Sequence, residues 1–229
     1  GLGIPAEPLF RSARFSAWDS SVPSQLRGTY AAFPLEDTDG VRALRELADA
    51  GLTTLHLLPT FDIASSEIPE DRATQQSPKV EGGELLPQNQ EKLASFVGWG
   101  ADSKLPSAAV QRVQNSDAFN WGYEPYHWMC PEGSYASSGN QHGGRRVFEY
   151  RSMVHSLHEL GLRVVQDVVF NHTTGSGLGS MSVLDKVVPG YYHRRSAKGD
   201  LETSTCCANV ATERVMAEKL MVDSLVSAA

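Results

Sequence analysis

The 229-residue sequence predicts an α/β fold, because two segments show a helix followed by a strand and a further helix follows them. In both segments, apolar residues at helical spacing end at a glycine, and an apolar run begins directly after it. Helices that alternate with buried strands are typical of parallel sheets. At this length the chain is expected to form one domain over residues 1–229.

The first helix–strand unit spans residues 39–59. Asp39 is a suitable N-cap for the helix, and Gly51 is a suitable left-handed C-cap. Four apolar side chains recur at helical spacing between them: Val41, Leu44, Leu47 and Ala48. Residues 53–58 then form an apolar run that predicts a buried strand.

The second unit spans residues 148–170, and its helix ends at Gly161. The run 162–170 alternates little and holds four valines: Val164, Val165, Val168 and Val169. Such a strand is expected to be covered on both faces, as central parallel strands are. A third helix over 211–226 spreads its apolar residues over a broad arc, which suits packing on a sheet.

Two long loops follow the predicted strands. Residues 62–119 are rich in Pro, Gln, Ser and Glu, which predicts a long cleft-side insert with short helices near 90–96 and 108–114. Residues 171–209 follow the second strand. Because both loops leave the carboxyl ends of strands, we expect them to border the ligand site.

Composition argues against two classes of partner. The net charge of −7 and the pI near 5.5 do not suit a nucleic-acid surface, which needs clustered Lys and Arg. No apolar run approaches the roughly 18 residues that a membrane span needs. The chain starts at Gly1 rather than Met and shows no signal-peptide layout, so any targeting information is expected upstream. A neutral or polar ligand fits these features best.

The three cysteines are Cys130, Cys206 and Cys207. An odd number predicts no disulfide framework, and the adjacent pair is not expected to bridge itself. Their spacing matches no zinc motif, and an N-cap at Asn209 or Thr212 explains the polar residues around the pair. A reducing compartment is the resulting expectation.

One candidate site is the aromatic segment 120–128. Trp121 and Tyr123 can stack against the apolar faces of sugar rings, and neighbouring groups can hydrogen-bond hydroxyls: Asn120, Glu124 and His127. The alternative is that Trp121 and Tyr123 are core aromatics that hold a loop in place. The residues alone leave both interpretations open.

A second candidate site is the end of the second strand. There Asn171 and His172 are expected at the carboxyl mouth of the strand, where a ligand hydroxyl can be met, and Asp167 can orient a neighbouring donor. The alternative makes Asp167 a buried acid satisfied by the backbone and His172 a solvent-exposed loop residue.

Two further patterns are weaker. A glycine-rich loop at 175–179 follows a strand, but its third glycine is misplaced for a dinucleotide loop and no helix begins directly after it. His155 and His158 lie three apart on a predicted helix, and the spacing offers no third metal ligand. A nucleotide-binding α/β enzyme is therefore the weakest alternative.

Motifs in a fixed order cover nearly the whole chain from about Phe15 onward. They comprise residues 15–19, 22–23, 26–28, 47–53, 56–61, 120–123, 131–136, 149–151, 167–172, 183–186, 188–192 and 218–225. Each motif alone is unspecific, but the ordered set resembles the catalytic barrel of pullulanase and limit dextrinase-type debranching enzymes, in the α-amylase superfamily (glycoside hydrolase family 13).

The resemblance implies a partial (β/α)8 barrel, made of the first three βα units, whose open end binds α-glucan. It implies that His172 hydrogen-bonds the sugar at the cleavage subsite and that Tyr123 stacks under the same sugar. Asp167 and Asn171 match supporting positions, and Asn171 matches a calcium ligand of some relatives; no other cofactor is implied. The aromatic segment adds two expected substrate contacts: Asn120 and Trp121.

Family members hydrolyse α-1,6 linkages of starch, pullulan or limit dextrins by the retaining route, which needs two carboxyl groups about 5 Å apart. In the family these acids follow the fourth and fifth strands, and a third acid follows the seventh. This sequence ends before the fourth strand, so no catalytic residue is expected in it. The first strand is also expected to be incomplete, because residues 7–14 are interrupted by Pro8, Arg11 and Arg14.

Unpaired strand edges should leave such a chain unstable and inactive by itself. The first functional hypothesis is therefore a part of a debranching glycoside hydrolase. A non-catalytic glucan-binding protein derived from such an enzyme is the alternative from a different class. Relatives act in plastids in plants and algae, and in the cytoplasm or outside the cell in bacteria.

Overall fold

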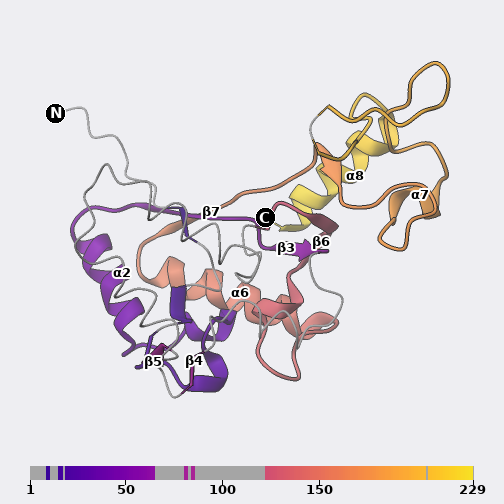
Figure 1. Ribbon diagram of the computed structural model, residues 1–229. Helices are drawn as coiled ribbons and strands as arrows, with labels where there is room; N and C mark the ends of the chain where they lie inside the picture. The colour runs from indigo at the N-terminus through magenta and orange to yellow at the C-terminus, as the bar shows by residue number, and fades with distance from the viewer. Residues whose placement is uncertain are drawn as a thin grey trace, which may run out of the picture.

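The computed structural model describes residues 9–10, 15–17, 19–64, 80–81, 84–85, 122–204 and 206–228. The largest sheet among them has three parallel strands in the order β1-β2-β7: β1 (Leu9–Phe10), β2 (Thr54–Leu57) and β7 (Arg163–Gln166). A helix lies between each two consecutive strands of this sheet along the chain, so the predicted α/β class is confirmed (Figure 1). The helices predicted near 90–96 and 108–114 lie outside the described residues.

The first predicted helix is present as α2 (Asp39–Asp49). The prediction that Asp39 is its N-cap was wrong. Thr38 holds that position in an extended conformation, and its hydroxyl accepts a hydrogen bond from the Val41 amide at 3.4 Å. Gly51 follows the helix with φ of 105°, a left-handed conformation that glycine adopts without a steric cost.

The second predicted helix is α6 (Gly144–Glu159). Its buried residues Met153 and Leu157 belong to one apolar cluster with Leu55 of β2 and with two aromatic side chains from the segment before α2: Tyr30 and Phe33. Burial of this apolar surface is the main force that holds the helix against the sheet.

Strand β7 is shorter than predicted and is not covered on both faces. It spans Arg163–Gln166 instead of 162–170, and exposure alternates along it. Val164 packs against the core cluster, whereas Val165 points away and is 41% exposed. Within the described residues β7 pairs only with β2, so it forms an edge of the sheet with one uncovered face.

An antiparallel ribbon follows the sheet and was not predicted. It joins β3 (Phe61–Ile63) to β6 (Pro125–Pro131), which are about 60 residues apart in sequence. The buried Glu132 stabilises the ribbon, because its two carboxylate oxygens accept hydrogen bonds from the amides of Ile63 at 2.7 Å and Ser134 at 2.8 Å. The ribbon therefore extends the carboxyl end of β2 toward residues 122–131.

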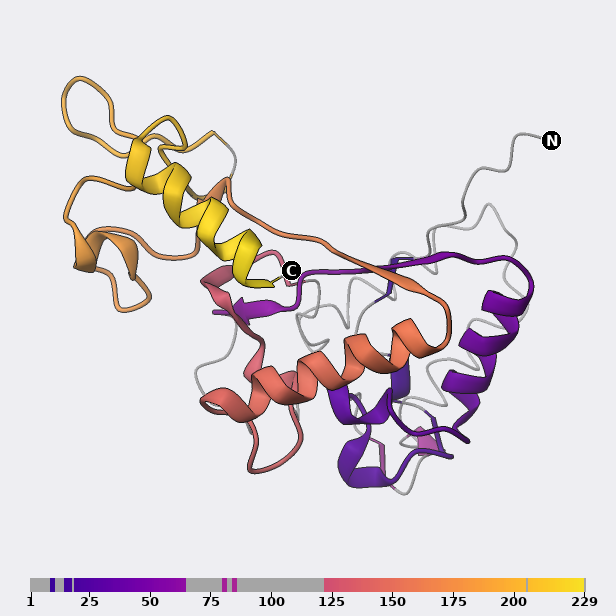
Figure 2. The ribbon, with the colours of Figure 1, turned by 180° about the vertical axis from the view of Figure 1, so that it is seen from behind.

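The remaining chain forms a lobe beside the ribbon (Figures 1 and 2). It contains β8 (His172–Thr173), α7 (Leu184–Val187), β9 (Ala208–Asn209) and α8 (Val215–Ala228). Helix α8 begins later than the predicted residue 211, and it packs through Ala217 on Trp128 of β6 rather than on the parallel sheet. Antiparallel β8 and β9 close the base of the loop between them.

The other short elements are η1 (Ser24–Leu26), η2 (Tyr30–Ala32), β4 (Val80–Glu81), β5 (Glu84–Leu85) and η4 (Gly133–Tyr135). Across the described parts of the chain, no helix combines the length and the apolar character that crossing a membrane requires.

Candidate functional site

Three of the predicted site residues lie together beyond the carboxyl end of β7. The Tyr123 hydroxyl donates a hydrogen bond to the Asp167 carboxylate at 2.6 Å. His172 Nε2 lies 3.2 Å from the backbone carbonyl oxygen of Tyr123. Tyr123 thus connects the strand end to β8, and the structure brings together an aromatic face, a carboxylate and an imidazole.

The position of Tyr123 depends on the glycine before it. Gly122 has φ of 80°, and a Cβ atom added to it would lie 2.6 Å from the carbonyl oxygen of Pro59. A side chain at position 122 would therefore need both an unfavourable backbone conformation and a displaced loop. On the other side of Tyr123, the Thr174 amide donates to the Pro125 carbonyl at 3.2 Å.

Burial and hydrogen bonding change the acidity of two groups at this site. Burial, together with the hydrogen bond to Asp167 and its negative charge, raises the pKa of Tyr123 to about 12. Tyr123 therefore remains a neutral donor at physiological pH. Burial also raises the pKa of Glu124, and the nearby His172 only partly offsets this effect.

Asp167 and His172 are both shielded from solvent, to different degrees. Asp167 is half-buried and is satisfied by the Tyr123 hydroxyl, and its own amide continues the β2–β7 ladder by donating to Leu57 at 3.0 Å. His172 is 8% exposed, so it is not a solvent-exposed loop residue. Its Nδ1 is buried and has no hydrogen-bond partner among the described residues.

The remaining predicted site residues are less informative. Asn120 and Trp121 lie outside the described residues. Asn171 is exposed, and its backbone carbonyl accepts the Val210 amide at 3.0 Å. Calcium prefers six to eight oxygen ligands, and no cluster of three His, Cys, Asp or Glu ligands suited to it is found at Asn171 in the described chain. Calcium at Asn171 therefore stays a prediction.

We expect Tyr123 and Asp167 to stabilise the fold as a pair. Tyr123→Phe and Asp167→Ala should each lower the free energy of unfolding, and the double variant should lose less than the sum of the two. A hydrogen bond to a charged group contributes about 1.5–3 kcal/mol, so the coupling energy should be about 1 kcal/mol or more at this half-buried site. Urea denaturation of the four proteins measures it, and additive losses would contradict the pairing.

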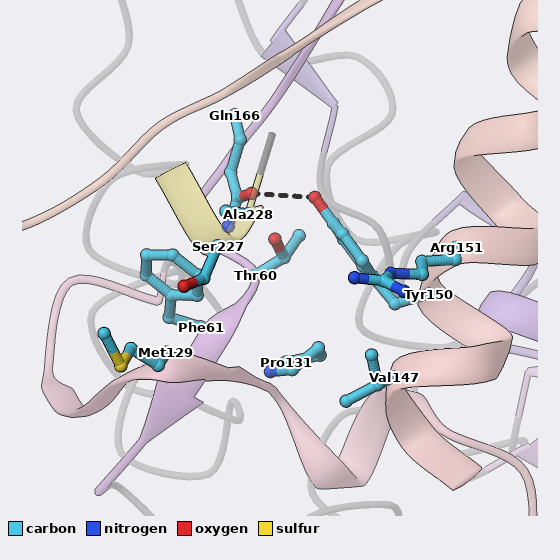
Figure 3. Close-up of a pocket in the computed structure, with 10 residues that line it drawn as sticks. All are labelled: Thr60, Phe61, Met129, Pro131, Val147, Tyr150, Arg151, Gln166, Ser227 and Ala228. Carbon is cyan, nitrogen blue, oxygen red and sulfur yellow. Dashed lines mark hydrogen bonds between the residues drawn. The ribbon is translucent and has the colours of Figure 1, made fainter. Parts of the chain in front are cut away.

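A separate small pocket of about 50 Å³ lies between α6, the β3–β6 ribbon and the end of α8 (Figure 3). In it the Tyr150 hydroxyl donates to Gln166 Oε1 at 2.7 Å, across the space between the helix and the strand end. Ser227 and Ala228 of α8 form one wall. The pocket is too small for a sugar ring and does not include Tyr123 or His172, so we do not identify it as the ligand site.

The prediction that the two adjacent cysteines do not bridge was wrong. A disulfide joins Cys206 to Cys207, whose Cα atoms are 3.8 Å apart. Neighbouring residues can close such a ring through the peptide that connects them, although this separation is shorter than in most disulfides. Cys130 is a free cysteine and is half-buried on β6.

Both weak patterns lie within the described residues and make internal contacts. The amide of Gly177, in the glycine-rich loop, donates to the carboxylate of Asp185 at 2.6 Å, so this loop amide already has an internal anion as its partner. His155 and His158 lie on the exposed face of α6, and the nearest carboxylate to His155 is Glu159 at 3.4 Å on the same helix.

Sequence reasoning missed a buried polar cluster in the lobe. Its centre is Asp185, which accepts the amides of Gly177 and Gly190 and lies 3.1 Å from His193 Nδ1. His193 Nε2 in turn lies 2.7 Å from the hydroxyl of Thr173 on β8. The cluster fixes the residue that follows His172. The signal that could have indicated it is an acid between two glycines, Gly177 and Gly190, whose amides it accepts.

Comparisons with known proteins show which proteins this chain resembles. No protein-family model matches the chain. Pullulanase 1, chloroplastic, of Arabidopsis thaliana is 42% identical over 214 residues, which cover 93% of this chain and 20% of that protein. The pullulanase of Klebsiella aerogenes is 37% identical over 232 residues, covering 92% of this chain and 21% of its own.

Solved structures give the same result. The crystal structure of Klebsiella pneumoniae pullulanase complexed with maltotriose matches with a TM-score of 0.76 and 34% identity, covering 96% of this chain and 22% of that one. The isoamylase of Pseudomonas amyloderamosa is more distant, at 27% identity over 92% of this chain. Over nearly all of its length, and over about a fifth of theirs, this chain is therefore homologous to pullulanase-type debranching enzymes.

Proposed function

We propose that these 229 residues supply part of a sugar-binding subsite in a pullulanase-type α-1,6-glucosidase. The observation that carries the proposal is the joint placement of Tyr123, Asp167 and His172 at the carboxyl end of β7. The ligand is an α-glucan, a class that includes starch, pullulan and limit dextrins. The Klebsiella pneumoniae relative complexed with maltotriose supports an oligosaccharide as the ligand.

Each residue has a defined part in this proposal. The Tyr123 ring stacks under one glucose ring, where aromatic faces favour the apolar C–H surface of a sugar. Asp167 fixes the ring orientation through the phenol hydroxyl. His172 Nε2 is held by the Tyr123 carbonyl, which leaves Nδ1 for a sugar hydroxyl. Asn120 and Trp121 are proposed as further contacts in the same segment.

We further propose that the chain forms the first three βα units of a (β/α)8 barrel. The element order β1-α2-β2-α6-β7-α8 and the parallel strand order β1-β2-β7 support this reading. In such a barrel the site faces the carboxyl ends of the strands, where Tyr123 and Asp167 lie. The long loop 62–119 would then border the cleft.

The proposal assigns no catalytic acid to the chain. Retaining hydrolysis needs a nucleophilic carboxylate and a protonated acid about 5 Å apart. Asp167 is engaged by the Tyr123 hydroxyl. Glu124 is partly buried, which raises its pKa above that of an ordinary glutamate. The proposal does not pair it with a second carboxylate. We propose that the two acids are supplied by other parts of the complete enzyme, which acts in plastids in plants and algae and in or outside the cytoplasm in bacteria.

Glucan binding by the chain tests the proposal. Calorimetric titration with maltotriose should show binding, and Tyr123→Ala should weaken it about 2- to 13-fold, because an aromatic contact contributes about 0.5–1.5 kcal/mol. Phe148→Ala is the matched control, since Phe148 is an aromatic residue of α6 that is 73% exposed and away from the site. Unchanged binding in Tyr123→Ala would contradict the subsite.

The same preparation separates the proposal from its alternatives. With pullulan as substrate, a reducing-sugar assay should detect no product from the 229-residue chain. Sugar release would contradict the assignment of no catalytic acid. Binding without hydrolysis is expected both for a part of an enzyme and for a non-catalytic glucan-binding protein. To distinguish these two hypotheses, the chain is joined to the rest of a pullulanase barrel and assayed again. Restored hydrolysis supports the enzyme.

A further inference from the structure

The β8–β9 pairing places two sulfur atoms beside the proposed sugar-binding histidine. His172 pairs with Asn209 across the two strands, and Cys206 and Cys207 directly precede β9. One ligand atom from each of these three residues lies within 4.8 Å of the other two. In the described part of the chain this is the one group of three potential His, Cys, Asp or Glu metal ligands.

The hydrogen bonding of His172 prepares it as a metal ligand. Metal-bound histidines usually donate the N–H of their other ring nitrogen to a backbone carbonyl or a carboxylate. The Tyr123 carbonyl lies 3.2 Å from Nε2 and accepts such a bond. With the proton on Nε2, the lone pair is on Nδ1, which is buried and has no partner among the described residues. The His172 side chain is 8% exposed and therefore carries a ring nitrogen without a partner in this part of the chain, and a ring nitrogen of this residue lies within 4.8 Å of both sulfurs.

We propose that reduction of the Cys206–Cys207 disulfide converts this cluster into a binding site for one zinc ion. The ligands are His172 Nδ1 and the two cysteine sulfurs. A Cys2His set leaves a fourth tetrahedral position for water. Zinc bonds of about 2.3 Å to sulfur and 2.0–2.1 Å to nitrogen require ligand atoms about 3.5–3.8 Å apart at tetrahedral angles, so the sulfurs must separate after reduction.

The conversion is chemically balanced with a phosphine as reductant. The phosphine attacks the disulfide, takes up the oxygen of one water molecule and becomes a phosphine oxide, while the two sulfurs receive the two protons of that water. Zinc then replaces both thiol protons, which are released to the solvent. Cys206 is exposed and Cys207 is half-buried, so a reductant in solution reaches the pair.

Zinc at this site occupies the nitrogen that the proposed function assigns to a sugar hydroxyl. Zinc and maltotriose should therefore compete for the reduced protein, and this consequence, unlike the metal site itself, rests on the proposed function. If zinc binds but does not compete with maltotriose, the sugar contact of His172 is wrong and the metal site stands.

The metal site is tested by titration without any glucan. The phosphine-reduced chain should bind one equivalent of Zn²⁺ in competition with a chromophoric chelator, and Co²⁺ should give the near-ultraviolet thiolate charge-transfer band of a tetrahedral site. The oxidised chain should bind neither ion at the same concentration. Because the oxidised chain carries no substitution, it remains a valid comparison even if a variant fails to fold.

Substitutions identify the ligands. Cys206→Ser and Cys207→Ser should each weaken zinc binding at least about 100-fold, and His172→Gln at least about 10-fold, since even changes outside the ligand shell cost 10- to 100-fold. Cys130→Ser is the matched control and should bind as the unsubstituted chain does, because Cys130 lies on β6 outside the cluster. Equal affinity in the oxidised chain, or in folded His172→Gln, would overturn the proposal.

Discussion

Glu132→Ala should destabilise the protein by about 2–6 kcal/mol, because two buried amides would lose their acceptor and each costs about 1–3 kcal/mol when unsatisfied. Glu132 is fully buried, and its carboxylate accepts the amides of Ile63 and Ser134. Its own amide donates to the Thr60 carbonyl at 2.7 Å. The substitution therefore weakens the β3–β6 ribbon at the point where it leaves the sheet.

Urea denaturation followed by far-ultraviolet circular dichroism measures this loss. Glu132→Gln should lie between the wild type and the alanine variant, since one amide oxygen can accept only part of what two carboxylate oxygens accept. Glu46→Ala, on the exposed face of α2, is the matched control and should change stability by less than about 0.5 kcal/mol. A similarly small effect of Glu132→Ala would mean that the ribbon is held by other contacts.

Asp185→Asn should remove part of the acid sensitivity of the protein. Burial by itself raises the pKa of Asp185, but hydrogen bonds from the amides of Gly177 and Gly190 and the proximity of His193 outweigh it, so the net pKa is lowered. A carboxylate whose native pKa lies below its unfolded value of about 3.9 stabilises the fold above that pH. This contribution is lost as the pH falls through the lowered native pKa.

The measurement is the free energy of unfolding from pH 7 down to pH 3. At pH 7 the variant should be less stable than the wild type by about 1.5–3 kcal/mol, the range for a hydrogen bond to a charged group. The difference should shrink below about pH 4, because protonation removes the same charge from the wild type. Asp200→Asn, an exposed acid of the same lobe, should not alter the curve. Parallel curves for Asp185→Asn and wild type would contradict the assignment.

Local sequence patterns correctly predicted the helices and strands that are determined by residues close together in the chain. Helix α2, strand β2 and helix α6 follow from apolar spacing and from glycines at 51 and 161 that adopt positive φ. The length of β7 was overestimated, since a run of valines favours a strand but does not determine where its pairing stops. Pairing with β2 ends at Gln166.

Local sequence patterns could not predict contacts between residues that are far apart in the sequence. The β3–β6 ribbon pairs residues about 60 positions apart, and no local signal specifies its register. Tyr123, Asp167 and His172 were expected at the site from the residue pattern and from the family resemblance, but their hydrogen bonds depend on the fold. Glu132 and Asp185 were within matching motifs without an assigned role. Their importance comes from the backbone amides that they accept, which composition does not reveal.

The loop between β8 and β9 has an exposed tip and a base that is closed by strand pairing. Ser196 and Asp200 form a backbone turn at the exposed tip, where Gly199 has φ of 89°. Added or deleted residues at this tip would alter the reach of the loop without moving the His172–Asn209 register at its base. Length changes at the tip would therefore leave the His172 imidazole and the Cys206–Cys207 sulfurs in place beside each other.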